Sequence, residues 1–252
     1  MKGRVRDRGI LVKTSNYSES SLVMRVYTQG HGMIGILAKG IRKKQDAVLP
    51  APLCEYDFCL YEPQEGGLYL LSEFAPLAEL DFAADPEKWA AAECALELYS
   101  ALIIPAEETA EYYRLLQTWL DFLTTLAGSA ILVWWRFLLR VFKMLGVALD
   151  VETCSECRKS GKAAAAWDQG NSGLLCGDCL AASANPSRFE LFSPAASRIL
   201  GLLPEIGNYL DSLKPSGRAV RELNSFFAAY YQTHFNRLLK LRSLGVLEQF
   251  YC

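Results

Sequence analysis

Hydrophobic and polar residues alternate in short runs through the first 80 residues of the chain. In the segment "SLVMRVYT", Leu22, Met24 and Val26 fall on one face of an extended chain, and the residues between them fall on the other. Five such runs occur, at residues 10–14, 21–28, 33–39, 53–61 and 68–72. Turn signals such as "QGHG" and "EPQEGG" separate the runs. The pattern predicts five short strands in a small closed barrel, and the OB-fold is the small barrel commonly used on oligonucleotides.

The pattern changes after residue 84, where apolar residues recur at helical spacing. Asp85 is suited to cap a helix, Pro86 suits the first helical position, and Pro105 ends this helix. Further helices are predicted at residues 107–126, 129–145, 193–203 and 218–244, and a cysteine-rich segment interrupts them. The sequence therefore predicts an α+β multidomain chain. Its parts are an OB-fold domain at 1–80, an α-helical domain at 81–150 and 184–252, and an inserted four-cysteine module at 151–183.

Two CxxC motifs separated by 18 residues form the most specific motif of the chain. Their cysteines are Cys154, Cys157, Cys176 and Cys179. This spacing is typical of a zinc site in which two turns present four sulfurs to one tetrahedral ion. The alternatives are disulfides, which are unexpected without an export signal, and redox chemistry, which would need a motif that opens a helix after a strand. Four thiolate ligands leave no open coordination position, so we expect Zn²⁺ to have a structural role.

Basic residues are concentrated near the start of the chain. Residues 1–44 hold ten Lys/Arg against two Asp/Glu, whereas the other 208 residues hold 16 against 26. This segregation favours contact between one module and a polyanion, although basic N-terminal segments also occur without such a role. Hydrophobic residues make up 51% of the chain, which is enough for packed cores and excludes a disordered protein.

An apolar run ending at Leu37 leads directly into a basic segment, which we predict to be a loop that neutralises phosphate groups. The DNA-binding candidates are Arg25, Lys39, Arg42, Lys43 and Lys44. Arg25 and Tyr27 share the outward face of the second predicted strand. Tyr27 could therefore stack on a base, or it could be a packing residue.

No segment is long and apolar enough to span a bilayer. The longest apolar run, "ILVWWRFLLRVFKML" at residues 131–145, is 15 residues long and carries three cations. The opening "MKGRVRDRG" lacks the apolar region of an export signal. We therefore expect a cytoplasmic protein that makes no contact with a membrane, and the DNA-binding interpretation of the basic segment implies association with the nucleoid.

Motifs of known catalytic sites are absent from the sequence. The chain has two histidines, His31 and His234, and neither has a partner at metal-ligand spacing. The HExxH, GxSxG and GxxxxGK[ST] motifs do not occur. A metallohydrolase would need an open zinc position, which four cysteine ligands do not leave. The sequence therefore predicts a binding protein and not an enzyme.

The run at residues 131–145 places three cations at helical spacing within an apolar surface. Arg136, Arg140 and Lys143 fall on one face of the predicted helix. One interpretation is a core helix whose single polar stripe is solvated. The other is a groove in which Arg136 and Arg140 bind an acidic peptide that ends in a carboxylate.

The segment "YSESSLVMRVYTQGHGMIGILAKGIRKKQ", residues 17–45, strongly resembles the start of the RecO family of recombination mediators. The shared features are a "W/Y-x-E-x-S" segment, a strand that ends near a "T-x-x-x-G" turn, and an "A-K-G-x-R" element. The resemblance continues in "LCEYDF", "LYLLSEFAPL", "LLRVFKMLGVALDVETCSEC" and "LKLRSLGVL", and it is low at residues 85–129. It therefore covers most of the chain.

This resemblance implies an N-terminal OB-fold, an α-helical domain and a zinc module, and the cysteines place the chain with the zinc-bearing form. RecO-like proteins bind single- and double-stranded DNA and anneal complementary strands. They act with RecR, and in some lineages with RecF, to let RecA replace the single-strand binding protein SSB. They also bind the acidic C-terminal tail of SSB, for which Arg136 and Arg140 are the candidates here. The alternative function is an RNA-binding or transcription-related adaptor that combines an OB-fold with a zinc ribbon.

Overall fold

The computed structural model describes residues 3–43, 49–79, 82 and 84–252. The chain forms two compact units, Met1–Thr125 and Leu126–Cys252. The predicted change from strands to helices near residue 80 is present, because the last strand of the first unit ends at Glu79 and the first helix begins at Pro86. Two helices nevertheless belong to the same unit as the strands. Within the described residues, no helix is both long enough and apolar enough to cross a membrane.

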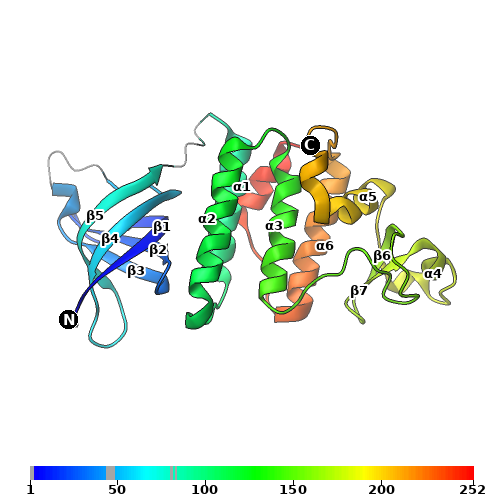
Figure 1. Ribbon diagram of the computed structural model, residues 1–252, viewed down its shortest axis with the longest axis horizontal. Coiled ribbons are helices and arrows are strands. Elements are labelled where there is room, and N and C mark those ends of the chain that lie inside the picture. The colour runs from blue at the N-terminus through cyan, green and yellow to red at the C-terminus, as the bar shows by residue number, and fades with distance from the viewer. Residues whose placement is uncertain (1–2, 44–48, 80–81, 83) are drawn as a thin grey trace. The chain divides into compact units, whose positions relative to one another are not determined.

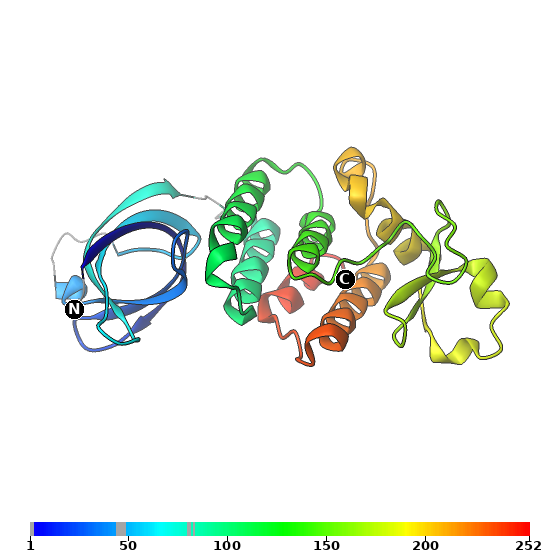
Figure 2. The same ribbon diagram turned by 60° about the horizontal axis from the view of Figure 1, so that its bottom comes forward.

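The predicted five-stranded N-terminal sheet is confirmed. Its strands are β1 (Arg4–Asn16), β2 (Leu22–Thr28), β3 (Gly32–Ala38), β4 (Cys54–Tyr61) and β5 (Tyr69–Glu79). They pair in the order β1-β2-β3-β5-β4, and β4 also pairs with β1. The ring closes only through a short parallel contact between β3 and β5, in which Ile36 faces Tyr69 and Leu37 faces Leu70. The strands curve around a common centre (Figure 2).

Successive side chains of each strand point to opposite faces, and those on the inner face form the core of the sheet. Met24, Val26, Ile36, Phe58 and Leu60 are buried in one cluster inside it. Gly9 is needed at its position on β1, because an added Cβ would lie 2.4 Å from Cγ1 of Val26. β1 begins at Arg4, six residues before the predicted start. The hydrophobic pattern did not predict this part of the strand because it is rich in charged residues. It is nevertheless a strand, since it pairs with β4 from Arg4 to Ile10.

Helices α1 (Pro86–Ala101) and α2 (Thr109–Thr125) complete the first unit (Figure 1), with the 3₁₀ turns η1 (Ile41–Lys43) and η2 (Ala106–Glu108). The predicted cap of α1 is confirmed, because the Asp85 side chain accepts a hydrogen bond from the Lys88 N–H and Pro86 is the first helical residue. The Tyr99 hydroxyl donates to the Tyr112 carbonyl at 2.8 Å and thereby joins α1 to α2.

Glu55 of β4 joins the sheet to α2 through a buried carboxylate. One carboxylate oxygen accepts from the Tyr113 hydroxyl at 2.6 Å, and the other accepts from Nε2 of Gln117 at 2.9 Å. Burial raises the pKa of Tyr113, and its hydrogen bond to Glu55 acts in the same direction. The phenol therefore remains a neutral donor to the buried carboxylate at physiological pH.

Replacing Tyr113 with phenylalanine is expected to lower the stability of the first unit by about 1–3 kcal/mol, because a buried carboxylate would lose a hydrogen-bond donor. Hydrogen exchange of α2 peptides across a urea series would measure the loss. The matched control is Tyr17→Phe, since the Tyr17 side chain is 64% exposed. Equal stability of the two variants would contradict this role for Tyr113.

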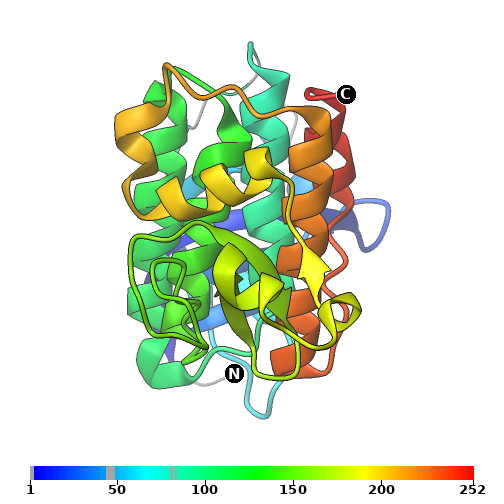
Figure 3. The same cartoon turned by 90° about the vertical axis from the view of Figure 1, so that its right-hand side faces the viewer.

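The second unit contains helices on which a small cysteine-rich module packs (Figure 3). Its helices are α3 (Ala130–Met144), α5 (Pro194–Leu202), α6 (Gly217–Phe235) and α7 (Arg242–Gln249), with the 3₁₀ segment η4 (Leu203–Tyr209). The module contains β6 (Ala164–Asp168), β7 (Gly173–Cys176), α4 (Gly177–Ala181), η3 (Pro186–Arg188) and β8 (Glu190–Leu191). These strands form a three-stranded sheet in the order β7-β6-β8.

The prediction of one long helix over residues 218–244 is wrong. Asn236 takes a left-handed conformation, with φ at 50°, and ends α6. Asparagine tolerates this conformation, so it is a common residue just after a helix. A separate helix, α7, begins at Arg242. Leu238, which fits the helical spacing of the sequence, is 61% exposed in the segment between the two helices.

Candidate nucleic-acid interface and metal site

The basic loop predicted after β3 is held in place by backbone contacts. The backbone N–H of Arg42 donates to the Ser20 carbonyl at 3.1 Å, and the N–H of Gly40 donates to the Ser21 hydroxyl at 3.2 Å. Gly40 has φ at +67°, a conformation that suits glycine. Ile41 is buried at 6% exposure and anchors the loop in the core of the sheet. The turn between β1 and β2 therefore fixes the loop at the end of β3.

Three cations of this loop are exposed: Lys39, Arg42 and Lys43. None of them makes an ion pair with any residue that the structure describes. Lys44, the fourth predicted cation, lies outside the described residues. We call Lys39, Arg42 and Lys43 the basic loop. An anchored backbone with unpaired cations is suited to bind a chain of phosphates, since the protein side loses little freedom on binding.

Arg25 is exposed on β2 and contacts α1. Its guanidinium donates to the Ser100 carbonyl at 3.1 Å, near the C-terminal end of that helix. A cation is favoured there, because helix C-termini carry partial negative charge. On the neighbouring strand β1, Lys13 lies directly opposite Arg25. Arg25 therefore lies within a cationic pair on the sheet and also positions a helix, and its contact with DNA stays a prediction.

The interpretation of Tyr27 as a stacking platform for a base is wrong. Tyr27 is 1% exposed, and its hydroxyl donates to the Thr109 carbonyl at 3.3 Å. Its ring lies edge-on to Tyr99 at 5.0 Å and stacks on Tyr113 at 6.5 Å. The strand alternation correctly placed Tyr27 opposite the sheet core. It did not indicate that α1 and α2 cover that part of the face, so the alternative of a packing residue holds.

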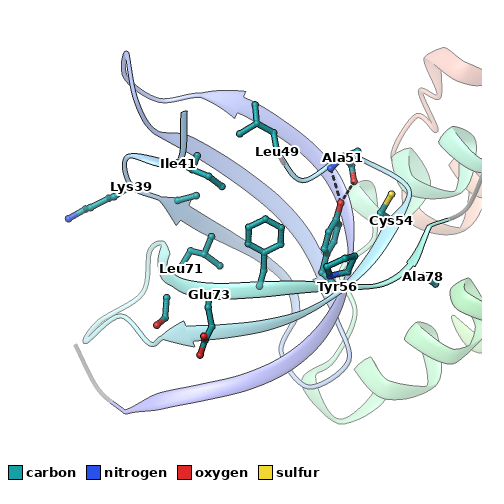
Figure 4. A pocket seen from close by; sticks show the side chains of 13 residues that line it. Lys39, Ile41, Leu49, Ala51, Cys54, Tyr56, Leu71, Glu73 and Ala78 are labelled. Atoms are coloured by element: carbon teal, nitrogen blue, oxygen red, sulfur yellow. Dashed lines mark hydrogen bonds between the residues drawn. The ribbon is translucent and has the colours of Figure 1, made fainter. Parts of the chain in front are cut away.

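An apolar cavity of about 640 Å³, which the sequence did not reveal, lies beside the basic loop (Figure 4). Tyr56, Leu71 and Phe74 contribute to its wall. Lys39 and Glu73 lie at its rim, and both side chains point away from the interior in Figure 4. The cavity follows from the short β3–β5 contact, because β5 continues far beyond the two residue pairs that join it to β3.

The predicted cationic stripe of the second unit lines a cavity of about 410 Å³. Arg136, Arg140 and Lys143 of α3 contribute to it, together with residues 148–152 and Pro204. Burial lowers the pKa of Arg136, and the positive charge of Arg140 acts in the same direction. Two carboxylates, Asp150 and Glu152, also line the cavity. None of the three cations forms an ion pair with a residue in the described part of the chain.

The four cysteines of the CxxC motifs lie together. Their sulfurs are all within 4.8 Å of one another, and the sulfurs of Cys157 and Cys176 are 3.9 Å apart. A tetrahedral zinc site with Zn–S distances of about 2.3 Å places its sulfurs about 3.8 Å apart. A disulfide would bring two sulfurs to about 2.05 Å. The spacing therefore fits a shared metal ion and not a disulfide.

Backbone N–H groups around the cluster stabilise the ionised, thiolate form of its cysteines. The N–H of Cys176 donates to the sulfur of Cys154 at 3.3 Å. Burial opposes ionisation of Cys154, but backbone hydrogen bonds from Cys157, Cys176 and Glu156 outweigh it and lower the pKa of Cys154 to about 6. Burial, hydrogen bonds with the other three sulfurs and the charge of Cys154 raise the pKa of Cys179 to about 12. Four thiolates this close repel one another, so the donor set suits a divalent cation among them.

The rest of the module is small. Cys154 and Cys176 are buried with Ala166, Leu175 and Phe189 in a single cluster. The Ser155 N–H donates to the Leu174 carbonyl at 2.8 Å and joins the first CxxC turn to β7. So few apolar residues give little hydrophobic stabilisation, which is the situation in which a structural metal supplies folding free energy.

Two family models match the chain, and they divide where the strands of the first unit end and its helices begin. The family model "Recombination protein O N terminal" matches residues 1–79, and "Recombination protein O C terminal" matches residues 83–244. The chain belongs to the RecO family. Members of this family act in DNA repair and recombination, so the RecO resemblance stated from the sequence motifs is confirmed.

Named RecO proteins match over almost the whole chain. The chain is 26% identical over 254 residues to the DNA repair protein RecO of Moorella thermoacetica, covering 96% of this chain and 91% of that protein. It is 28% identical over 249 residues to the DNA repair protein RecO of Frankia casuarinae, covering 97% and 98%. It is 28% identical over 255 residues to the protein of the same name from Streptomyces coelicolor, again covering 97% and 98%.

Proposed function

We propose that this RecO-family chain binds DNA through the basic loop and anneals complementary single strands, and that it thereby helps RecA to replace SSB. The observation that carries the proposal is the anchored loop whose cations, Lys39, Arg42 and Lys43, are exposed and have no carboxylate partner within the described residues. Annealing forms no covalent bond, so it requires no catalytic side chain.

The physical task in annealing is to bring two polyanions together. Each strand repels the other, and base pairing begins only when their phosphates are partly neutralised. Cations at the end of β3 can neutralise several phosphates and release the counterions that those phosphates held. Binding driven in this way does not depend on base sequence, so the bases stay available for pairing. We expect both single- and double-stranded DNA to bind.

A fluorescence assay with complementary oligonucleotides coated with SSB tests this function. The protein is expected to accelerate pairing without ATP and to leave the DNA strands chemically unchanged. The control reaction uses two non-complementary strands under the same conditions. No acceleration over SSB-coated DNA alone would contradict the proposal.

We further propose that the four cysteines bind one structural Zn²⁺. Cys154, Cys157, Cys176 and Cys179 would each supply one thiolate. A closed four-sulfur site supplies folding free energy and offers no position for a substrate. The ion would hold together the two CxxC turns of a module whose own core is small.

The cavity on α3 is proposed as the site for the acidic C-terminal tail of SSB. Its apolar wall and unpaired Arg136 and Arg140 fit a peptide that ends in a carboxylate. RecR, and in some lineages RecF, are proposed as further partners from the family resemblance.

Replacing Arg136 with glutamate is expected to weaken binding of an SSB tail peptide at least 10-fold, because the new side chain would carry the same negative charge as the peptide. Fluorescence anisotropy of a labelled peptide measures the affinity. Arg198→Glu is the matched control, since Arg198 is an exposed cation on α5. An unchanged affinity of the Arg136→Glu variant would contradict this assignment.

A further inference from the structure

A second group of exposed cations follows α6 in the second unit. Arg237, Lys240 and Arg242 are exposed within six residues of sequence. None of them makes an ion pair with a residue for which the structure gives a placement. No acidic residue occurs between Arg237 and Leu247. The nearest one that follows, Glu248, accepts a hydrogen bond from the Asn224 side chain at 2.8 Å.

The backbone explains why these cations face solvent. The left-handed Asn236 ends α6, and its N–H donates to the Gln232 carbonyl. The chain then continues without regular structure to Arg242, the first residue of α7. Arg237 and Lys240 therefore lie on a short connection between two helices, and Arg242 begins the second helix; none of the three has a carboxylate partner among the described residues.

An apolar and aromatic surface continues from this connection along α7. Val246 and Phe250 follow Arg242 at intervals of four residues, so Val246 shares one side of α7 with Arg242, and Phe250, the residue just after the helix, continues that side. Val246 is 48% exposed and Phe250 is 45% exposed. We call the cations and these two side chains the C-terminal basic surface; it consists of Arg237, Lys240, Arg242, Val246 and Phe250.

The distribution of charge over the chain is consistent with a second polyanion site. Residues 126–252 contain 14 Lys/Arg against 10 Asp/Glu. Residues 45–125 contain two Lys/Arg against 16 Asp/Glu. The acidic excess that follows the basic N-terminal segment is therefore confined to the middle of the chain. The second unit is net positive and would attract nucleic acid in its own right.

Unpaired cations beside an exposed aromatic ring are the combination that binds single-stranded nucleic acid. The cations neutralise phosphates, and bases stack on the ring without regard to their sequence. We propose that the C-terminal basic surface binds a second single strand while the basic loop of the first unit binds the first. This inference rests on the proposed annealing function, which requires two strands to meet.

Two sites on one chain would change the kinetics of annealing. When both strands are bound to the same molecule, their encounter becomes intramolecular, and the effective concentration of one strand near the other reaches the millimolar range for short connections. At nanomolar strand concentrations, free strands meet far less often. The second site would therefore accelerate pairing even if each site alone bound DNA only moderately.

The test compares Arg237→Glu/Lys240→Glu with the matched control Arg198→Glu/Lys214→Glu, whose cations are also exposed in the second unit. Native mass spectrometry with a dT15 oligonucleotide counts the strands bound per chain. We expect two strands on the wild type and on the control, and one strand on the Arg237→Glu/Lys240→Glu variant. The annealing rate of that variant is expected to fall at least 10-fold. A neutral Arg237→Gln/Lys240→Gln variant should give an intermediate rate and guards against misfolding of the charge-reversed chain.

Several outcomes would overturn the inference. Two strands bound to the Arg237→Glu/Lys240→Glu variant, or an unchanged annealing rate, would show that this surface does not bind the second strand. Normal annealing with loss of activity only when other repair proteins are added would assign the surface to a protein partner instead. A wild type that anneals with one strand per chain would overturn this inference alone. A wild type that binds no DNA would overturn the proposed function as well.

Discussion

Changing Lys39, Arg42 and Lys43 to glutamate in one variant is expected to weaken single-stranded DNA binding at the basic loop roughly 100-fold at about 50 mM salt. Each lost phosphate contact should also reduce the slope of log affinity against log salt by about 0.7. The triple variant should therefore have a slope smaller by about 2, because three contacts are lost. The effect should be the same for all DNA sequences, since phosphate contacts carry no sequence information.

The size of this effect follows from how the loop is built. Its cations have no carboxylate partners within the described residues, so their charge is available to phosphates. The hydrogen bonds from Arg42 to Ser20 and from Gly40 to Ser21 use the backbone, so they survive replacement of the side chains. The guanidinium of Arg42 also donates to the Ser18 carbonyl, at 3.5 Å, and this contact is lost in the variant. The backbone hydrogen bonds remain, so the variant should keep its fold.

Anisotropy titrations with labelled dT20 over a salt series measure both quantities. The matched control reverses three exposed cations of the second unit, Arg198, Lys214 and Arg221, and so changes net charge by the same amount. An equal loss of affinity in both variants would mean that only overall charge matters. An unchanged salt slope in the basic-loop variant would contradict a role for the loop in DNA binding.

Replacing Cys154 and Cys176 with alanine is expected to abolish zinc binding and to unfold the module around them. Two thiolates cannot complete a tetrahedral site, and structural zinc contributes on the order of 10–16 kcal/mol to small metal-dependent folds. Ala166, Leu175 and Phe189 form too small a core to replace that stabilisation. Strands β6 and β7 should therefore lose their protection from hydrogen exchange.

Zinc content per chain, measured by atomic emission, should be one in the wild type and zero in the double variant. Cys252→Ala is the control, because Cys252 is an exposed cysteine outside the cluster. The barrel should keep its own hydrogen-exchange protection in all three proteins. A module that stays folded with no zinc bound would contradict the structural role of the metal.

Local features of this fold could be predicted from the sequence. The alternation in β2 to β4 defined strands because each has one face in the barrel core. The four-cysteine cluster was predictable because each CxxC turn places its two sulfurs locally, and only the approach of one turn to the other depends on the fold. The cap of α1 was predictable for the same reason, since Asp85 and Pro86 act within one turn.

Features that depend on distant contacts could not be predicted. Alternation placed Tyr27 on the outer face, but only α1 and α2 decide that this part of the face is buried. The end of α6 was missed because Leu238 continues the helical spacing, whereas the conformation of Asn236 stops the helix. Asp150 and Glu152 line the same cavity as Arg136. They come after α3 in the chain, so the spacing of residues within α3 does not predict that they lie there.

Photo-cross-linking tests most directly whether the basic loop is where DNA binds. A single strand carrying photoreactive thymidine analogues would be cross-linked to the full-length protein, and the modified peptides would be identified by mass spectrometry. We expect adducts in peptides that contain Lys39, Arg42 or Lys43, and their loss when these residues are changed to glutamate. Adducts confined to residues outside the first unit would contradict DNA binding by the basic loop.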